Sequence, residues 1–127
     1  MSARFFAIVG ALLAFIGVAA GAFGAHALKT RLASDALAVF EVGVRYHLLH
    51  AIALLAVGWA NTQWPGRAAR LSGWLFIAGI TIFSGSLYLL ALTGQRALGA
   101  ITPVGGVCLL VGWLALAWAA WRGATRG

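Results

Sequence analysis

Four long stretches without a charged residue constrain this chain more than any other feature of its sequence. They cover residues 5–28, 46–66, 71–95 and 97–121. A helix needs about 20 residues to cross about 30 Å of hydrocarbon, so each stretch is long enough to span a bilayer. With 63% hydrophobic and only 9% charged residues, the chain also has more apolar surface than a small soluble fold can bury. We therefore expect an integral membrane protein, and the same composition excludes a disordered chain.

Short connections between these stretches predict an antiparallel arrangement. Pro65 and Gly66 mark a turn, and Gly94 is suited to end the third helix. We predict an all-α membrane protein, a four-transmembrane-helix antiparallel bundle that forms a single integral membrane domain over residues 1–127. The spans are placed at approximately residues 5–27, 46–63, 71–93 and 98–121.

The longest connection, residues 29–45, is predicted to hold an amphipathic lead-in to the second helix. Ser34 is suited to cap a helix, and Asp35 favours its positive end. Glu41 and Arg45 stand four residues apart with the acid first, which favours an ion pair along a helix. We therefore expect a helix that begins at Ser34 and continues into the second span.

The first stretch has a second interpretation, as a cleaved signal peptide. Arg4 precedes it, and the sequence of residues 25–27 (AHA) is similar to a cleavage site. However, the uncharged run exceeds the roughly 7–15 residues of a signal-peptide core. Its length therefore favours a span that stays in the protein.

The cations lie between the apolar stretches and not in one patch. Nine Lys and Arg residues against two acids give a net charge of +7. Scattered in this way, the cations are typical of headgroup anchors and topology signals, so membrane lipids are expected partners and nucleic acid is not. The end that holds the chain termini has slightly more of them: Arg4, Arg67, Arg70, Arg122 and Arg126, against Lys29, Arg31, Arg45 and Arg96. The positive-inside rule then predicts that both termini lie in the cytoplasm.

Most chemically versatile side chains are expected at the other end of the bundle. This candidate polar cluster comprises His26, Glu41, Arg45, Tyr46, His47, His50, Ser84, Ser86 and Thr102. Three histidines could meet as a proton relay, a metal site or a haem ligand pair, because imidazole titrates near neutral pH and binds metals. A metal site would need further ligands, and Glu41 is the only nearby carboxylate. We predict no metal and no cofactor, and we favour histidines that lie at the interface or hydrogen-bond across helices.

No catalytic residue is predicted. A serine nucleophile needs a base and an oxyanion hole, which nothing in the sequence supplies in recognisable form. Ser84 and Ser86 are instead expected to bond to backbone carbonyls and to bend their helix.

Small residues recur at helical spacing in the first and fourth spans. Gly10, Gly17, Gly21 and Gly24 form one stripe together with Ala14, and Gly112 begins another. Small residues let helix backbones approach where no hydrophobic effect drives association. Such stripes are either packing seams within one bundle or surfaces for self-association. We favour packing within the bundle, because four spans already offer partners.

Several ordered strings resemble a known family. They are residues 21–28 (GAFGAHAL), Glu41 with residues 43–47 (GVRYH) and 50–51 (HA), residues 83–88 (FSGSLY), 92–94 (LTG) and 98–106 (LGAITPVGG), followed by Gly112 and Trp113. Together they resemble the YgdD-like family of small bacterial inner-membrane proteins, a domain of unknown function. The resemblance covers nearly the whole chain. It implies uncleaved, multi-span insertion in the inner membrane and no particular reaction.

Three hypotheses for function follow. The leading one is a small binding or accessory component without catalysis, whose partner is a second copy or another membrane protein. The alternative is an oligomeric transporter or channel component for a proton or small solute, built on Glu41, Arg45 and the three histidines. A haem- or quinone-linked redox subunit is the third, and it depends on the histidines alone.

Overall fold

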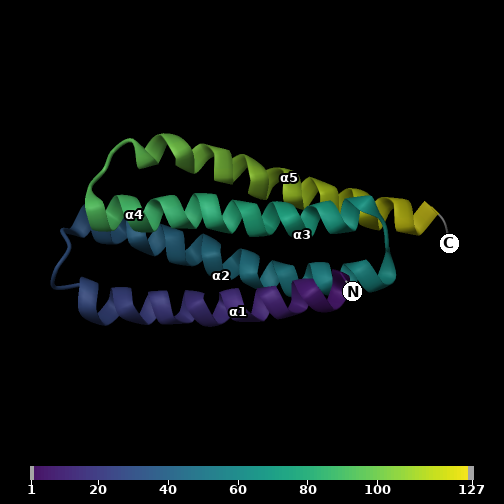
Figure 1. Ribbon diagram of the computed structural model, residues 1–127, viewed down its shortest axis with the longest axis horizontal. Coiled ribbons are helices and arrows are strands. Elements are labelled where there is room, and N and C mark those ends of the chain that lie inside the picture. Colours follow the sequence, from purple (N-terminus) through teal and green to yellow (C-terminus); the bar gives the residue numbers. More distant parts are fainter. Residues whose placement is uncertain (1, 126–127) are drawn as a thin grey trace.

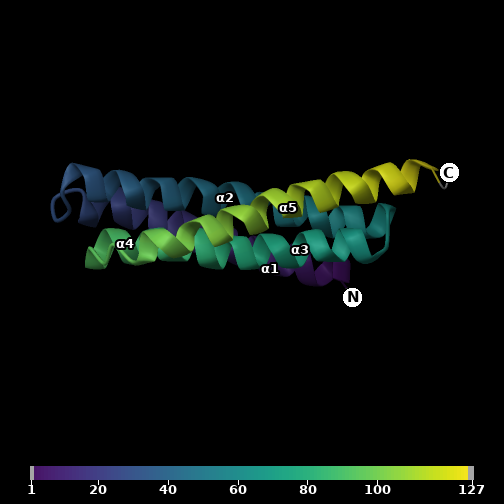
Figure 2. The ribbon, with the colours of Figure 1, turned by 90° about the horizontal axis from the view of Figure 1, so that it is seen from above.

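The chain folds into four long helical rods in a computed structural model that describes residues 2–125. The rods are Ser2–Leu28, Ser34–Gln63, Arg67–Thr93 and Leu98–Thr125, each long and apolar enough to cross a membrane. Consecutive rods run antiparallel, and the turn between the second and third lies at the end that holds both termini (Figure 1). Seen from above, the fourth rod crosses the others obliquely (Figure 2). The predicted all-α, four-span bundle is confirmed.

Two of the rods contain a π-helical turn. The elements are α1 (Ser2–Phe23), η1 (Gly24–Leu28), α2 (Ser34–Gln63), α3 (Arg67–Gly79), η2 (Ile80–Ser84), α4 (Gly85–Thr93) and α5 (Leu98–Thr125), where η denotes π-helix. Thus η1 closes the first rod, and η2 interrupts the third. A π-turn inside an α-helix rotates the residues that follow it and often occurs near functional sites.

The second rod includes the predicted lead-in, because α2 is continuous from Ser34. Two details of the prediction are wrong. No side chain caps the helix; Asp35 Oδ1 instead accepts the backbone N–H of Ala36 at 2.9 Å. Glu41 and Arg45 form no ion pair within 4.0 Å. Both are exposed, and holding two long side chains in one geometry costs entropy that an exposed pair barely offsets.

Local hydrogen bonds fix both ends of the third rod. Gly94 adopts a left-handed φ of 72°, and its N–H bonds to the Leu90 carbonyl at 2.8 Å, which ends α4. At the other end of the third rod, the Asn61 amide donates to the carbonyls of Val57 (2.9 Å) and Ala69 (3.3 Å). This side chain therefore ties the start of α3 to α2.

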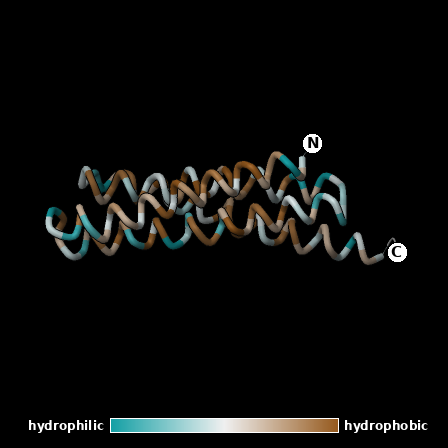
Figure 3. Tube along the Cα trace, turned by 90° about the horizontal axis from the view of Figure 1, so that it is seen from below, coloured by the Kyte–Doolittle hydropathy of each residue, from teal (hydrophilic) through white to brown (hydrophobic). Residues whose placement is uncertain are grey.

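The core lies between all four rods, and the outside of the bundle is apolar as well. The main buried cluster comprises Phe6, Ala53, Leu54, Val57, Phe76, Ile80 and Leu109. Large apolar side chains also face outward, among them Phe15 at 75% and Leu114 at 70% exposure. Hydrophobic residues dominate the middle of the bundle, and hydrophilic ones collect toward its ends (Figure 3). An apolar exterior of this kind matches the hydrocarbon of a bilayer.

The glycine stripes lie against neighbouring rods. A Cβ added to Gly10 would stand 2.8 Å from the Ala51 carbonyl, and one added to Gly24 would stand 2.9 Å from the Phe40 ring. Gly21 is looser, with 3.3 Å to Val44, and Gly112 lies against Phe76 of α3. Real Cβ atoms do not tolerate contacts below 3.0 Å, so Gly10, Gly24 and Gly112 stand where larger residues would push the rods apart.

Candidate functional site

The candidate polar cluster divides into an internal and an external group. His47, His50, Ser84 and Ser86 are buried and Thr102 is half-buried. His26, Glu41, Arg45 and Tyr46 are exposed. The internal residues hydrogen-bond to neighbouring rods, and of the external residues Tyr46 also contacts the third rod, with its ring 4.9 Å from the Phe83 ring between centroids.

His50 is held in one protonation state by its two partners. Its Nδ1 lies 2.7 Å from the Tyr46 carbonyl, and its Nε2 lies 3.0 Å from Nε1 of Trp113 on α5. A carbonyl can only accept and an indole N–H can only donate. Nδ1 therefore carries the proton and Nε2 accepts, which makes His50 the neutral Nδ1–H tautomer. Protonating Nε2 would break the bond to Trp113.

His47 joins α2 to both the first and the third rod. Its Nε2 donates to the Leu13 carbonyl of α1, and its Nδ1 faces the Tyr88 hydroxyl of α4, each at 2.8 Å. With Nε2 donating, the neutral ring accepts the tyrosine hydroxyl at Nδ1. Both nitrogens are thus engaged inside the bundle, where an unpaired polar group would be costly.

Two glycines make room for these contacts. A Cβ on Gly17 would stand 2.6 Å from Leu48 and 3.3 Å from the His47 ring, so α1 comes close enough for its carbonyl to reach that ring. A Cβ on Gly43 would stand 2.8 Å from the Tyr88 ring. Gly43 therefore lets the tyrosine lie across α2 toward His47.

The hydroxyl groups around η2 complete the internal group. Ser84, the last residue of η2, donates across to the Gly43 carbonyl at 2.7 Å. Ser86 lies 2.9 Å from the Phe83 carbonyl of its own rod and 2.6 Å from the Thr102 hydroxyl of α5. The expected back-bonding thus describes Ser86, whereas Ser84 bonds to another rod. Within residues 2–125, Ser72 Oγ is the one fully buried side-chain polar atom with no hydrogen-bond partner.

The external residues do not join the histidines into a relay or a metal site. His26 lies exposed in η1, and no hydrogen bond between described residues links it to His47 or His50. Tyr46 covers His50 from outside by ring stacking at 6.2 Å between centroids. In the part of the chain that the structure describes, no three His, Cys, Asp or Glu side chains are grouped to hold a metal ion.

Several partners in this network were missed by sequence reasoning. Sequence reasoning assigned Trp113 no structural role, yet its indole donates to His50 and packs on Phe76 at 4.9 Å between centroids. One signal was available: Trp113 lies in mid-span, whereas the other tryptophans lie near one end of the bundle. Nothing in the sequence could indicate the contact with the Leu13 carbonyl, because every residue has a backbone carbonyl.

Comparisons with known proteins identify relatives but no reaction. A family model described as "Protein of unknown function (DUF423)" matches residues 20–106, a stretch that contains the whole candidate polar cluster. A UPF0382 membrane protein of Staphylococcus saprophyticus is 46% identical over 119 residues, covering 89% of this chain and 93% of that protein. YwdK of Bacillus subtilis, also a UPF0382 membrane protein, is 42% identical over 118 residues, covering 92% and 96%. No solved structure matches. These names describe neither a reaction nor a transported solute, so the transporter alternative gains no support.

Proposed function

We propose that this chain, which belongs to the DUF423 family of proteins of unknown function, is a membrane-embedded binding component that catalyses no reaction of its own. The buried histidines support this proposal, because protein partners occupy both nitrogens of each ring. Residues held in this way stabilise the bundle. We therefore infer that any binding surface lies on the outside of the protein.

One observation carries the proposal: two exposed charged residues, Glu41 and Arg45, lie on an otherwise apolar helix face. We define the outward face of α2 as Ala38, Glu41, Arg45, Leu49, Ile52, Ala56 and Trp59, all exposed. These positions recur every three or four residues, which is the spacing of a helix–helix seam. Leu49 and Ile52 are 53% and 60% exposed.

The charged pair lies beside an apolar part of the first rod. Phe40 packs on Gly24 and Val44 on Gly21, so Glu41 and Arg45 lie level with the last turns of the first uncharged stretch. A charge that faces lipid costs up to about 2.5–3.5 kcal/mol at the bilayer centre and less toward the headgroups. A partner with complementary charges at the same depth removes that cost.

A second copy of this chain supplies those charges. When two α2 helices pack in parallel about a two-fold axis, Glu41 of each faces Arg45 of the other across one helical turn. Helices in contact lie about 8–10 Å apart, which glutamate and arginine side chains together can bridge. Leu49, Ile52 and Ala56 would then continue the seam toward the other end of the bundle. We thus propose a homodimer through the outward face of α2.

We also propose a more specific family for this chain and an orientation in the membrane. The strings around Glu41, Ser84 and Thr102 support placement in the YgdD-like group of inner-membrane proteins. Arg4, Arg67, Arg70 and Arg122 support a cytoplasmic location for both termini. A green fluorescent protein fused after the C-terminus should fluoresce, and alkaline phosphatase fused there should stay inactive. The reverse pattern contradicts this orientation.

Charge-reversal variants test the dimer. Native mass spectrometry of the detergent-extracted protein should show a dimer for the wild type and monomers for E41R or R45E, because each reversal sets like charges against each other. The E41R/R45E double variant should recover the dimer. Co-expressed E41R and R45E chains should form a mixed dimer, because each supplies the charge that the other needs.

A matched control is R96E, which reverses an exposed charge at the same end of the bundle but outside α2. It should remain a dimer. A monomeric wild type, or a folded double variant that stays monomeric, contradicts the homodimer. Co-purification of a different membrane protein that E41R releases would show that the partner is not a second copy.

A further inference from the structure

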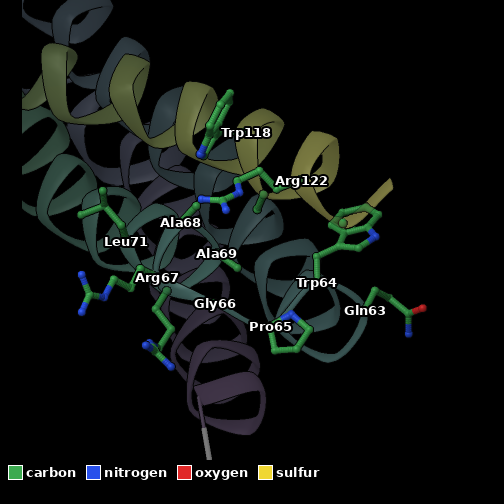
Figure 4. Close-up of a pocket in the computed structure, with 13 residues that line it drawn as sticks. Gln63, Trp64, Pro65, Gly66, Arg67, Ala68, Ala69, Leu71, Trp118 and Arg122 are labelled. Carbon is green, nitrogen blue, oxygen red and sulfur yellow. The ribbon is translucent and has the colours of Figure 1, made fainter. Parts of the chain in front are cut away.

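A cavity of about 940 Å³ opens at the end of the bundle that holds both termini, far from the candidate polar cluster. It lies between the start of α3 and the last turns of α5. Trp64 and Pro65 of the α2–α3 turn stand on one side, and Trp118 and Arg122 of α5 stand on another (Figure 4). The proposed dimer face does not include these residues.

The rim of this cavity is cationic, and no aspartate or glutamate side chain lies near it. Arg67, Arg70 and Arg122 all line it and are exposed. The two acids of the chain, Asp35 and Glu41, both lie in the first turns of α2 at the opposite end of the bundle. No side-chain carboxylate among the described residues therefore neutralises the three guanidinium groups, and the rim attracts anions.

The Arg122 side chain is oriented over the cavity. Its Cζ lies 6.0 Å from the centroid of the Trp118 ring, within reach of a cation–π interaction. The side chain extends from α5 toward Ala68 at the start of α3 (Figure 4). The guanidinium thus spans the mouth between the two helices, where it can meet a ligand that enters from the membrane surface.

The deeper wall of the cavity is apolar. Leu71 lies one helical turn below Arg67, and Trp118 lies one turn below Arg122, with Ala119 beside it. A cationic rim above an apolar floor, at the level where indole rings prefer to lie, matches a phosphate group followed by acyl chain. Free phosphate would use the rim alone.

We propose that this cavity binds the phosphodiester headgroup of an anionic phospholipid from the adjacent leaflet. Arg67, Arg70 and Arg122 hold the headgroup, and Leu71 and Trp118 contact the first carbons of the acyl chain. The start of α3 adds partial positive charge, since no side chain caps it. The cavity and its arginines carry the proposal, and the helix end contributes to it.

Native mass spectrometry with defined lipids tests this proposal. Wild-type protein is incubated with equal amounts of phosphatidylglycerol and phosphatidylcholine that have the same acyl chains. A cationic side chain at the membrane surface is worth about a fivefold preference for anionic lipid. We expect R122Q to lower the preference for phosphatidylglycerol by about fivefold, and R67Q/R70Q/R122Q to lower it by roughly 100-fold.

The control removes the same number of cations from the opposite end. K29Q/R31Q/R96Q should keep the wild-type preference, and circular dichroism verifies that each variant stays helical. If the triple variant fails to insert, R122Q alone still decides the question. Equal retention of the two lipids by the wild type, or an equal loss in the control variant, overturns the proposal. Displacement of the bound lipid by millimolar inorganic phosphate would identify a free-anion site and also overturn it.

Discussion

Replacing Gly105 by alanine should separate α5 from the π-helical turn that it packs against. A Cβ at this position would fall 2.8 Å from both Cα and Cβ of Phe83, and closer still to its backbone nitrogen. Carbon atoms in contact prefer about 3.5–4.0 Å, so the two helices must move apart by roughly 1 Å. The atoms in the way include backbone, which cannot rotate aside as a side chain can.

The magnitude follows from two opposing terms. Overpacking of this kind costs about 1–3 kcal/mol, and replacing glycine by alanine inside a helix returns about 0.5–1 kcal/mol. G105A should therefore lower the free energy of unfolding by about 1 kcal/mol and by at most about 2.5 kcal/mol. Gly106 is the matched control, since a Cβ there would meet the Phe83 ring at an ordinary 3.7 Å. G106A should be neutral, or more stable by less than about 1 kcal/mol.

The assay is reversible unfolding in mixed micelles, in which increasing dodecyl sulfate displaces a mild detergent and circular dichroism follows the helix content. Both variants keep the same helix, charge and side-chain chemistry, so their difference isolates the contact with Phe83. Equal stability of G105A and G106A would refute the close approach of α5 to η2. A loss confined to G105A would support it.

Three further outcomes can be measured by the same titration. W113F removes the indole donor to His50 and should cost about 0.6–1.7 kcal/mol, a loss that should be smaller when His50 is already replaced by leucine. S84A removes the donor to the Gly43 carbonyl and should cost about 0.6 kcal/mol without changing helix content. H26A should leave stability within about 0.5 kcal/mol of the wild type, since His26 is exposed in η1; a larger loss would show that this histidine belongs to the internal network.

The fold was more accessible to sequence reasoning than the site. Helix number and order depend on uncharged length and on turn residues such as Pro65 and Gly94, which act locally. Hydrogen-bond partners do not follow from such patterns. The exposed Glu41 and Arg45 formed no ion pair despite ideal spacing, because spacing says nothing about whether an exposed pair is worth its entropy.

Sequence by itself determined that this protein spans a membrane four times, with five of its six tryptophans and its acids toward opposite ends, because a helix of about 20 apolar residues satisfies its own backbone hydrogen bonds in hydrocarbon. Only the tertiary structure decided what each polar group does. His47 meets Tyr88 across 41 residues, and His50 meets Trp113 across 63. Such pairs depend on how closely the rods approach and how each is rotated. Glycines at the contacts determine how closely the rods approach, and the π-turn in the third rod determines part of its rotation. Three histidines that looked alike in the sequence therefore differ in the structure: His47 and His50 are buried and connect rods, whereas His26 is exposed.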